Sequence, residues 1–128
     1  LEQERDFDAF AHIDYICRYW PYKGAKRELR LQDAPELFDK LFLLLIEQNK
    51  PIEINTRRLD DAAAVAGLLP LYKRYRELGG KYCTLGSDAH YKEHVGRRLQ
   101  EALALAAQAE LTPVYFKARR MQIMEGLK

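Results

Sequence analysis

The sequence has little of what marks several large classes of protein. It contains only two cysteines, Cys17 and Cys83, and no CxxC pattern, so a zinc ribbon or a redox pair is unsupported. We expect both thiols to be reduced and buried, which suits a cytoplasmic location. No apolar run reaches the roughly 18 residues that a membrane-spanning helix needs, so we expect no membrane as a partner.

An excess of one charge is missing as well. The chain carries 21 basic and 19 acidic residues, for a net charge of +2, whereas a dedicated nucleic-acid binder normally has a strong basic excess. We therefore expect no nucleic acid as a partner, although a local basic pocket for a small anion stays open. The 128 residues show no internal repeat, and a content of 48% hydrophobic and 31% charged residues is typical of one globular domain.

Hydrophobic periodicity predicts strands that alternate with helices. Strands are expected at 7–15, 51–55, 81–86 and 112–116, the last extending to 123 in one alternative. Helices are expected at 34–48, 69–78 and 94–108, with a loop or short helix at 59–67. Asp33 is the expected N-cap of the first helix, and Gly79-Gly80 is expected to end the second. The first helix has its expected apolar stripe on Leu37, Leu41, Leu44 and Leu45. The order β-α-β-α-β-α-β predicts an α/β fold with a parallel sheet.

The ends of three predicted strands carry polar side chains that are suited to binding metals and phosphates. In chain order they are His12, Asp14 and Arg18; then Glu53, Asn55, Thr56 and Arg57; then Ser87, Asp88 and His90. Because the carboxyl ends of parallel strands meet at one edge of a sheet, we expect these side chains to converge. Imidazoles and carboxylates gathered in this way can bind a divalent metal.

Each of these residues also has a simpler interpretation. A lone histidine such as His12 is more often a hydrogen-bonded core or edge residue than a metal ligand. Asp88 could be only the N-cap of a following turn. Arg57 and Arg58 are more often a solvated pair than an anion site. The convergence of three segments therefore weighs more than any one residue.

Three of the segments resemble motifs of the PHP family of metal-dependent phosphoesterases. Ala11-His12-Ile13-Asp14 resembles the GHxD segment of that family, Ile52-Glu53-Ile54-Asn55-Thr56 its lEiNts strand, and Leu85-Gly86-Ser87-Asp88-Ala89-His90 its terminal GSDAH motif. The stretches 12–22 and 114–120 look most like the histidinol-phosphatase branch. The resemblance covers nearly the whole chain, and it implies a distorted (β/α)7 barrel with a trinuclear metal site.

The resemblance also implies a role for each matching residue. His12, Asp88 and His90 would bind the metals, and Asp88 and His90 would be the catalytic residues. Arg18 and Arg57 would grip the substrate phosphate, because a planar guanidinium suits bidentate contact with phosphate oxygens. Asp14, Glu53, Asn55 and Ser87 would line the pocket or support the ligands. The divalent metals would be zinc, manganese or iron.

One departure from the family is large. The family begins with an H-x-H motif, and no such motif occurs in these 128 residues. We therefore expect residues 1–128 to be a single domain, the C-terminal portion of a PHP barrel, which pairs with the missing N-terminal half or with a second copy.

The function that the resemblance implies is metal-dependent hydrolysis of a phosphomonoester. The implied substrate is histidinol phosphate, cleaved to histidinol and phosphate in histidine biosynthesis, and we expect the chain alone to be inactive. Two alternatives stay open. One is a PHP phosphoesterase that acts on another phosphorylated small molecule or a nucleotide, and the other is a non-enzymatic, degenerate PHP remnant.

Overall fold

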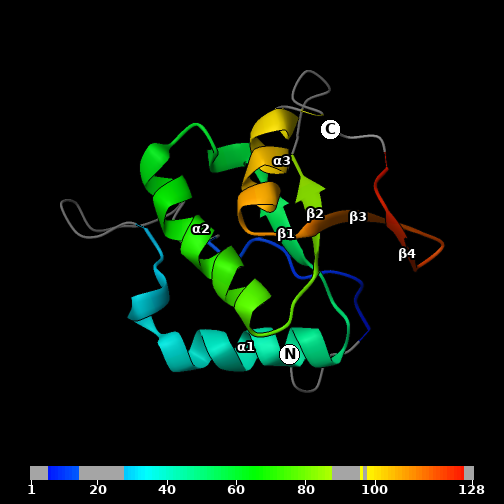
Figure 1. Ribbon diagram of the computed structural model, residues 1–128, viewed down its shortest axis with the longest axis horizontal. Helices are drawn as coiled ribbons and strands as arrows, with labels where there is room; N and C mark the ends of the chain where they lie inside the picture. The colour runs from blue at the N-terminus through cyan, green and yellow to red at the C-terminus, as the bar shows by residue number, and fades with distance from the viewer. Residues whose placement is uncertain (1–5, 15–27, 88–95, 97, 126–128) are drawn as a thin grey trace.

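A computed structural model of the chain describes residues 6–14, 28–87, 96 and 98–125. Within these ranges helices and strands alternate along the chain (Figure 1). The elements are the 3-10 turn η2 (Leu31–Asp33), α1 (Pro35–Glu47), β1 (Ile52–Asn55), the 3-10 turn η3 (Thr56–Arg58), α2 (Ala62–Glu77), β2 (Tyr82–Gly86), α3 (Leu99–Gln108), β3 (Thr112–Lys117) and β4 (Arg120–Ile123). The predicted α/β alternation is thus confirmed from α1 onward.

The strands form one sheet in the order β1-β2-β3-β4. The pairs β1–β2 and β2–β3 are parallel, as predicted, and only β4 runs antiparallel to its neighbour. β3 pairs with β2 only through Thr112 and Pro113, after which it leaves the sheet with β4 as a hairpin (Figure 1). The sheet proper is therefore built on β1 and β2.

The predicted first strand at 7–15 is wrong in extent. The described part of this segment forms a single parallel bridge between Phe10 and Ile52, with Phe10 N donating to Pro51 O at 3.0 Å and accepting at its carbonyl from Glu53 N at 2.8 Å. His12 then adopts a left-handed backbone, with φ of 57°, and a turn follows. A left-handed residue cannot continue an extended strand, so the pairing stops. The segment nevertheless lies beside β1, where the predicted strand would lie.

Helices α2 and α3 pack over one side of the sheet (Figure 1). In Figure 1 α3 lies over β1 and β2, α2 lies beside α3, and α1 crosses below them. Ile52 and Ile54 of β1 and Cys83 of β2 are fully buried in the resulting core. Glu53 and Asn55 alternate with those isoleucines and are only half-buried, as expected for a strand with two unlike faces.

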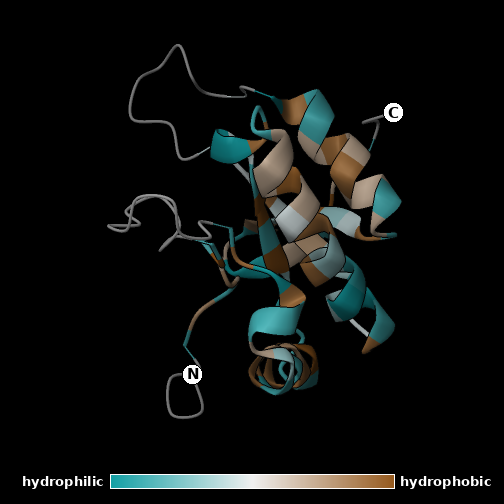
Figure 2. Cartoon of the chain, turned by 90° about the vertical axis from the view of Figure 1, so that its left-hand side faces the viewer, coloured by the Kyte–Doolittle hydropathy of each residue, from teal (hydrophilic) through white to brown (hydrophobic). Residues whose placement is uncertain are grey.

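The predicted apolar stripe of α1 is confirmed at Leu45 and is wrong at Leu37, because Phe38 and Phe42 supply the rest of the buried face. The helix buries Phe38, Phe42 and Leu45, whereas Leu37 is 67% exposed. The aromatic rings decide the buried face, because the Phe42 ring lies 6.0 Å from that of Phe38 and 5.8 Å from that of Tyr75. Figure 2 views α1 nearly end-on and shows hydrophobic colour around much of it, in agreement with the exposed leucine.

The start of α1 was also predicted incorrectly. Ala34, not Asp33, is the N-cap, and no side chain caps the helix there. Asp33 belongs to the preceding turn η2, and its carboxylate accepts a hydrogen bond from Arg30 N at 2.8 Å. The Asp33 side chain thus stabilises the turn η2 and does not cap α1.

The second helix is longer than predicted, because α2 begins at Ala62 and continues through Pro70. The side chain of Asp61 caps it by accepting from Ala63 N at 2.9 Å. Its predicted end is confirmed: Gly79 has φ of 117°, a conformation that suits glycine.

Two further boundaries depart from the prediction. The described part of the third helix begins at Leu99, and the predicted start at His94 lies outside the described residues. The alternative of one strand from 112 to 123 is wrong, because Ala118 and Arg119, with φ of 48° and 63°, turn the chain back as a hairpin.

Candidate functional site

The carboxyl ends of β1 and β2 lie side by side, and the register pairs Asn55 with Gly86. His12 lies at the same edge, because the segment that carries it runs beside β1 and its backbone N–H donates to Glu53 Oε2 at 3.2 Å. The sheet therefore brings together His12, Glu53, Asn55 and the start of the Gly86–Ser87 segment. This is the edge at which the polar side chains were expected to converge.

Glu53 lies at the centre of this edge. Its Oε2 also faces the Asn55 amide, with Nδ2 at 3.4 Å. Its other oxygen lies against Gly86, so closely that a β-carbon on Gly86 would be 2.1 Å from it. The carboxylate is thus positioned from three segments of the chain.

Asn55 directs the chain out of β1 into η3. Its side-chain oxygen accepts from Arg57 N at 2.9 Å, which caps the turn. Thr56 is buried, with 4% of its surface exposed, whereas Arg57 is exposed. The predicted phosphate-binding residue Arg57 therefore stands next to the edge with its side chain at the surface.

Arg58 is the site residue that the sequence interpretation missed. Its guanidinium donates to Asp14 Oδ2 at 2.6 Å and to both oxygens of Glu28 at 2.5 and 2.7 Å. All three side chains are only 12–13% exposed, so the interpretation of Arg58 as half of a solvated pair is wrong. Burial disfavours the charged guanidinium, but the hydrogen bonds to Glu28 and Asp14 outweigh that cost and raise the pKa of Arg58. Nothing in the local sequence pattern signals this triad, because its members lie far apart in the chain.

Tyr72 supports the edge from the core. Its side chain is 1% exposed, and its hydroxyl donates to the backbone oxygen of Glu53 at 3.3 Å. Burial, and then the charges of Asp14 and Glu53, raise the pKa of the Tyr72 phenol. The phenol therefore stays protonated and able to donate at neutral pH.

Three predicted site residues, Arg18, Asp88 and His90, lie outside the described residues. Within the described part of the chain, no group of three or more His, Cys, Asp and Glu side chains is arranged to hold a metal ion. The Asp14 carboxylate is paired with Arg58, which explains why it does not take part in a metal-binding group. Of the expected metal ligands, the structure thus describes only His12.

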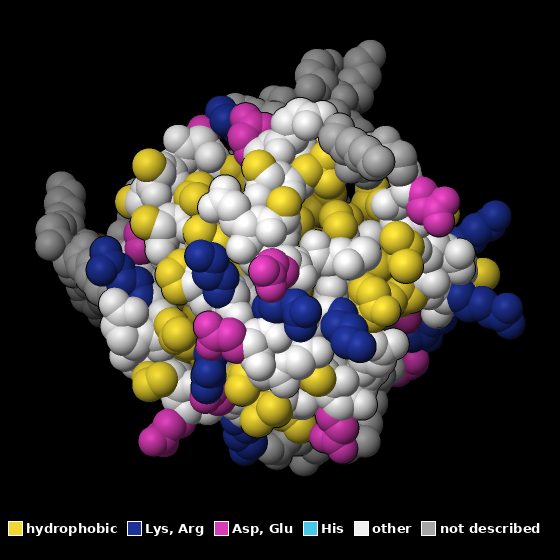
Figure 3. Space-filling view, viewed as in Figure 1, with side chains coloured by type: hydrophobic (Ala, Val, Ile, Leu, Met, Phe, Trp, Pro, Cys, Tyr) yellow, Lys and Arg dark blue, Asp and Glu magenta, His cyan; other side chains and the backbone are white. Residues whose placement is uncertain are grey.

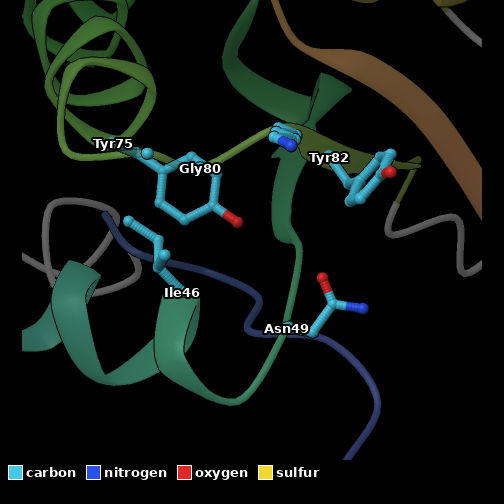
Figure 4. A pocket seen from close by; sticks show the side chains of 7 residues that line it. Ile46, Asn49, Tyr75, Gly80 and Tyr82 are labelled. Carbon is cyan, nitrogen blue, oxygen red and sulfur yellow. The ribbon is translucent and has the colours of Figure 1, made fainter.

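A cavity of about 300 Å³ opens at the opposite edge, near the amino ends of β1 and β2 (Figure 4). Ile46, Asn49, Tyr75 and Tyr82 line it, and the Tyr75 hydroxyl donates to Lys50 O at 2.8 Å. None of the predicted site residues that the structure describes lines it. The cavity is therefore separate from the candidate site.

Comparison with known proteins gives the chain a family relationship. No family model matches it. It is 41% identical to the probable histidinol-phosphatase of Clostridium acetobutylicum over 115 residues, which are 90% of this chain and 44% of that protein. The chain is related to the histidinol-phosphatases. It is also 30% identical to the histidinol-phosphatase of Lactococcus lactis and 33% identical to the probable histidinol-phosphatase of Thermotoga maritima, over 85% and 76% of this chain and 40% and 39% of those proteins.

The fold agrees with that relationship. A crystal structure of the histidinol phosphate phosphatase from Lactococcus lactis, complexed with zinc, L-histidinol and phosphate, superimposes with a TM-score of 0.79 at 25% identity. The match covers 94% of this chain and 46% of that histidinol-phosphatase. The expected family and the expected fold, part of a barrel, are therefore confirmed. The chain spans less than half the length of the histidinol-phosphatases it matches.

Proposed function

We propose that this chain is part of a metal-dependent phosphatase that hydrolyses histidinol phosphate to histidinol and phosphate. The similarity to histidinol-phosphatases over 90% of the chain carries the proposal. The convergence of His12, Glu53 and Asn55 at one sheet edge supports it, because these residues come from the motifs that suggested a phosphoesterase. Histidine biosynthesis is the pathway that such an activity would serve.

The proposed metal ligands are His12, Asp88 and His90. His12 lies at the edge where β2 ends, and Ser87, directly after β2, precedes Asp88 in the sequence. One imidazole with an aspartate and a second imidazole is a donor set that suits zinc, manganese or iron. The zinc in the Lactococcus lactis complex favours zinc among these. Bound metals would supply an activated water and neutralise charge on the phosphate.

A trinuclear centre would need more ligands than this chain offers. The chain spans 44% of the Clostridium acetobutylicum relative, and we propose that the H-x-H ligands come from the part that it does not span. The chain alone would then have little or no activity. Asp88 and His90 would act in catalysis only in the completed site.

Two arginines are proposed to hold the substrate phosphate. Arg57 is exposed at the end of β1 beside the edge, whereas the guanidinium of its neighbour Arg58 is occupied by two carboxylates. The exposure of Arg57 supports it as the arginine that contacts phosphate. Arg18 is the second, on the basis of its place in the motif. Their guanidinium groups would bind and orient the phosphate oxygens.

The hairpin of β3 and β4 supports the proposal that another part of the barrel, or a second copy, covers this chain. Val114 and Ile123 pair across it, and so do Phe116 and Met121, which gives one apolar face. Ile123 is 55% exposed, and Tyr115 on the other face is 49% exposed. Figure 3 shows apolar and basic side chains at the surface on the side of the hairpin. An apolar strand face of this kind normally packs against another element.

The remaining expectations concern partners and location. In the described part of the chain no helix is long and apolar enough to cross a membrane. The face in Figure 3 carries basic and acidic side chains interspersed, which does not favour a long nucleic acid as partner. Cys83 is a free, buried thiol, and we propose a cytoplasmic location because reducing conditions preserve such thiols.

A comparison of the full-length gene product with residues 1–128 tests the proposed function. Each is purified, its metal content is measured, and phosphate release from L-histidinol phosphate is followed with and without a chelator. We expect turnover by the full-length protein only, lost on chelation and restored by zinc. Chelator-sensitive turnover by residues 1–128 alone would contradict the proposed division of ligands, and no turnover by either would contradict the proposed function.

A further inference from the structure

Glu53 has a role that its motif does not explain. We propose that its carboxylate determines specificity by binding the ammonium group of the substrate, and that position 86 is glycine because this carboxylate occupies the space a side chain would need. The inference rests on the proposed function, since histidinol phosphate carries a primary amine that is protonated at neutral pH.

The fold turns the Glu53 side chain away from the core. Ile52 and Ile54, its neighbours in β1, are both 0% exposed against the helices, so Glu53 faces the opposite side of the sheet. Its backbone is held on both sides, because its N–H donates to Phe10 O at 2.8 Å and its carbonyl accepts from the Tyr72 hydroxyl at 3.3 Å. The backbone of Glu53 is therefore fixed, and its carboxylate is oriented by the contacts of Oε2 with His12 N and Asn55 Nδ2.

The carboxylate is oriented but not neutralised by the described residues around it. His12 N and Asn55 Nδ2, which both contact Oε2, are uncharged donors, and both contacts are long, at 3.2 and 3.4 Å. Among the described residues, no lysine or arginine forms an ion pair with Glu53. A half-buried carboxylate whose described partners are all uncharged favours the binding of a cation, which would compensate its charge. The ligand class that fits is a substrate with an ammonium group.

The lack of a side chain at Gly86 leaves room for this carboxylate, whereas the backbone conformation of Gly86 does not itself require glycine. A β-carbon at position 86 would lie 2.1 Å from Glu53 Oε1 and 2.9 Å from Glu53 Cδ, so the Glu53 carboxylate would have to leave its position to make room for one. Gly86 is not among the described glycines with positive φ, which are Gly79 and Gly96. Its backbone would therefore accept a side chain, but the Glu53 carboxylate occupies the space that this side chain would need.

Substrate selectivity is the direct test. In the full-length protein, Glu53→Gln keeps the size of the side chain and removes its charge. We expect kcat/KM for L-histidinol phosphate to fall about 10- to 100-fold, the worth of one charge-assisted hydrogen bond. We expect kcat/KM for p-nitrophenyl phosphate, which has no amine, to change less than about twofold, with metal content unchanged.

The outcomes separate the inference from the proposed function. Equal losses on both substrates, or loss of bound metal in Glu53→Gln, would overturn the inference and leave the proposed function intact. Wild-type protein that hydrolyses p-nitrophenyl phosphate but not histidinol phosphate would overturn the proposed function, and the inference with it.

A stability cycle tests the link to Gly86 without relying on activity. Gly86→Ala is introduced into the wild type and into Glu53→Ala, and thermal unfolding of all four proteins is measured. We expect Gly86→Ala to lower Tm by several degrees in the wild type and hardly at all beside Glu53→Ala. Gly96→Ala is the control, since nothing lies within 4 Å of its β-carbon position and its cost should be equal in both backgrounds. An equal cost of Gly86→Ala in both backgrounds would overturn this link.

Discussion

Removal of the Arg58 guanidinium should destabilise the fold more than removal of any other charge described in this structure. Arg58→Met is the informative change, because methionine keeps the packing of the aliphatic stem and deletes the charged group. The deletion leaves the carboxylates of Asp14 and Glu28 close together without their cation. Both are side chains that the surrounding protein largely shields from water.

The magnitude follows from the geometry of the triad. Three charge-assisted hydrogen bonds, at 2.6, 2.5 and 2.7 Å, are lost at once. At about 1.5–3 kcal/mol each, their sum is about 5–9 kcal/mol before relaxation. The exposed fractions of 12–13% allow some water to reach the freed carboxylates, which reduces the loss. We therefore expect a loss of about 3–5 kcal/mol in the free energy of unfolding, the usual cost of breaking a buried ion pair.

Urea-induced unfolding, followed by circular dichroism, measures this loss. Arg57→Met is the matched control, since Arg57 is exposed, and it should cost less than about 0.5 kcal/mol. Neutralising the partners by Asp14→Asn and Glu28→Gln in the Arg58→Met background should restore part of the stability. An Arg58→Met cost no larger than that of Arg57→Met would show that the triad is solvated and contributes no such stability.

Three further predictions concern the core and an ion pair. Phe42 is 0% exposed, so Phe42→Ala should lower the free energy of unfolding in urea by about 3–5 kcal/mol. Leu37 is 67% exposed, so Leu37→Ala should lower it by about 0.5 kcal/mol or less. Equal losses would show that the buried face of α1 is misassigned. Burial raises the pKa of Cys83 to about 12. In a variant without the other cysteine, the Cys83 thiol should therefore react with a disulfide reagent at pH 8 only after urea is added. Prompt reaction of the native protein would contradict the burial of this thiol. The Arg74 guanidinium lowers the pKa of Asp39 below 3.8, so this ion pair stabilises the fold at pH values above 3.8. The loss of unfolding free energy in Asp39→Asn should be present at pH 7 and should shrink as the pH falls through the lowered pKa. A loss that does not change with pH would exclude the ion pair as its source.

Much of the fold could be predicted because the local pattern and the final packing agree. The strands Ile52–Asn55 and Tyr82–Gly86 have the apolar residues that are typical of buried parallel strands. The bounds of both strands were predicted to within one residue. The departures arise where packing at long range decides. The ring of Tyr75 selects Phe42 for the core, and α2 continues through Pro70 because its apolar residues are buried on either side of the proline.

The candidate site was predictable to the extent that short motifs mark it. His12, Glu53 and Asn55 come from segments about 40 residues apart, yet strand topology alone predicts that they meet. The ion triad was not predictable, because an arginine beside a second arginine looks like surface. The close fit of Glu53 to Gly86 was equally hidden, since the glycine is explained by a side chain on a neighbouring strand.

We propose that the edge formed by β1 and β2 belongs to a metal-dependent histidinol phosphate phosphatase, and a substitution of Asp88 probes this proposal. The measurement is phosphate release from L-histidinol phosphate by zinc-loaded full-length protein with Asp88→Asn, beside Asp60→Asn as a control near the same edge. We predict that Asp88→Asn lowers kcat at least about 100-fold and reduces bound zinc, and that Asp60→Asn leaves both within about twofold. Unchanged turnover and zinc content in Asp88→Asn would contradict the account.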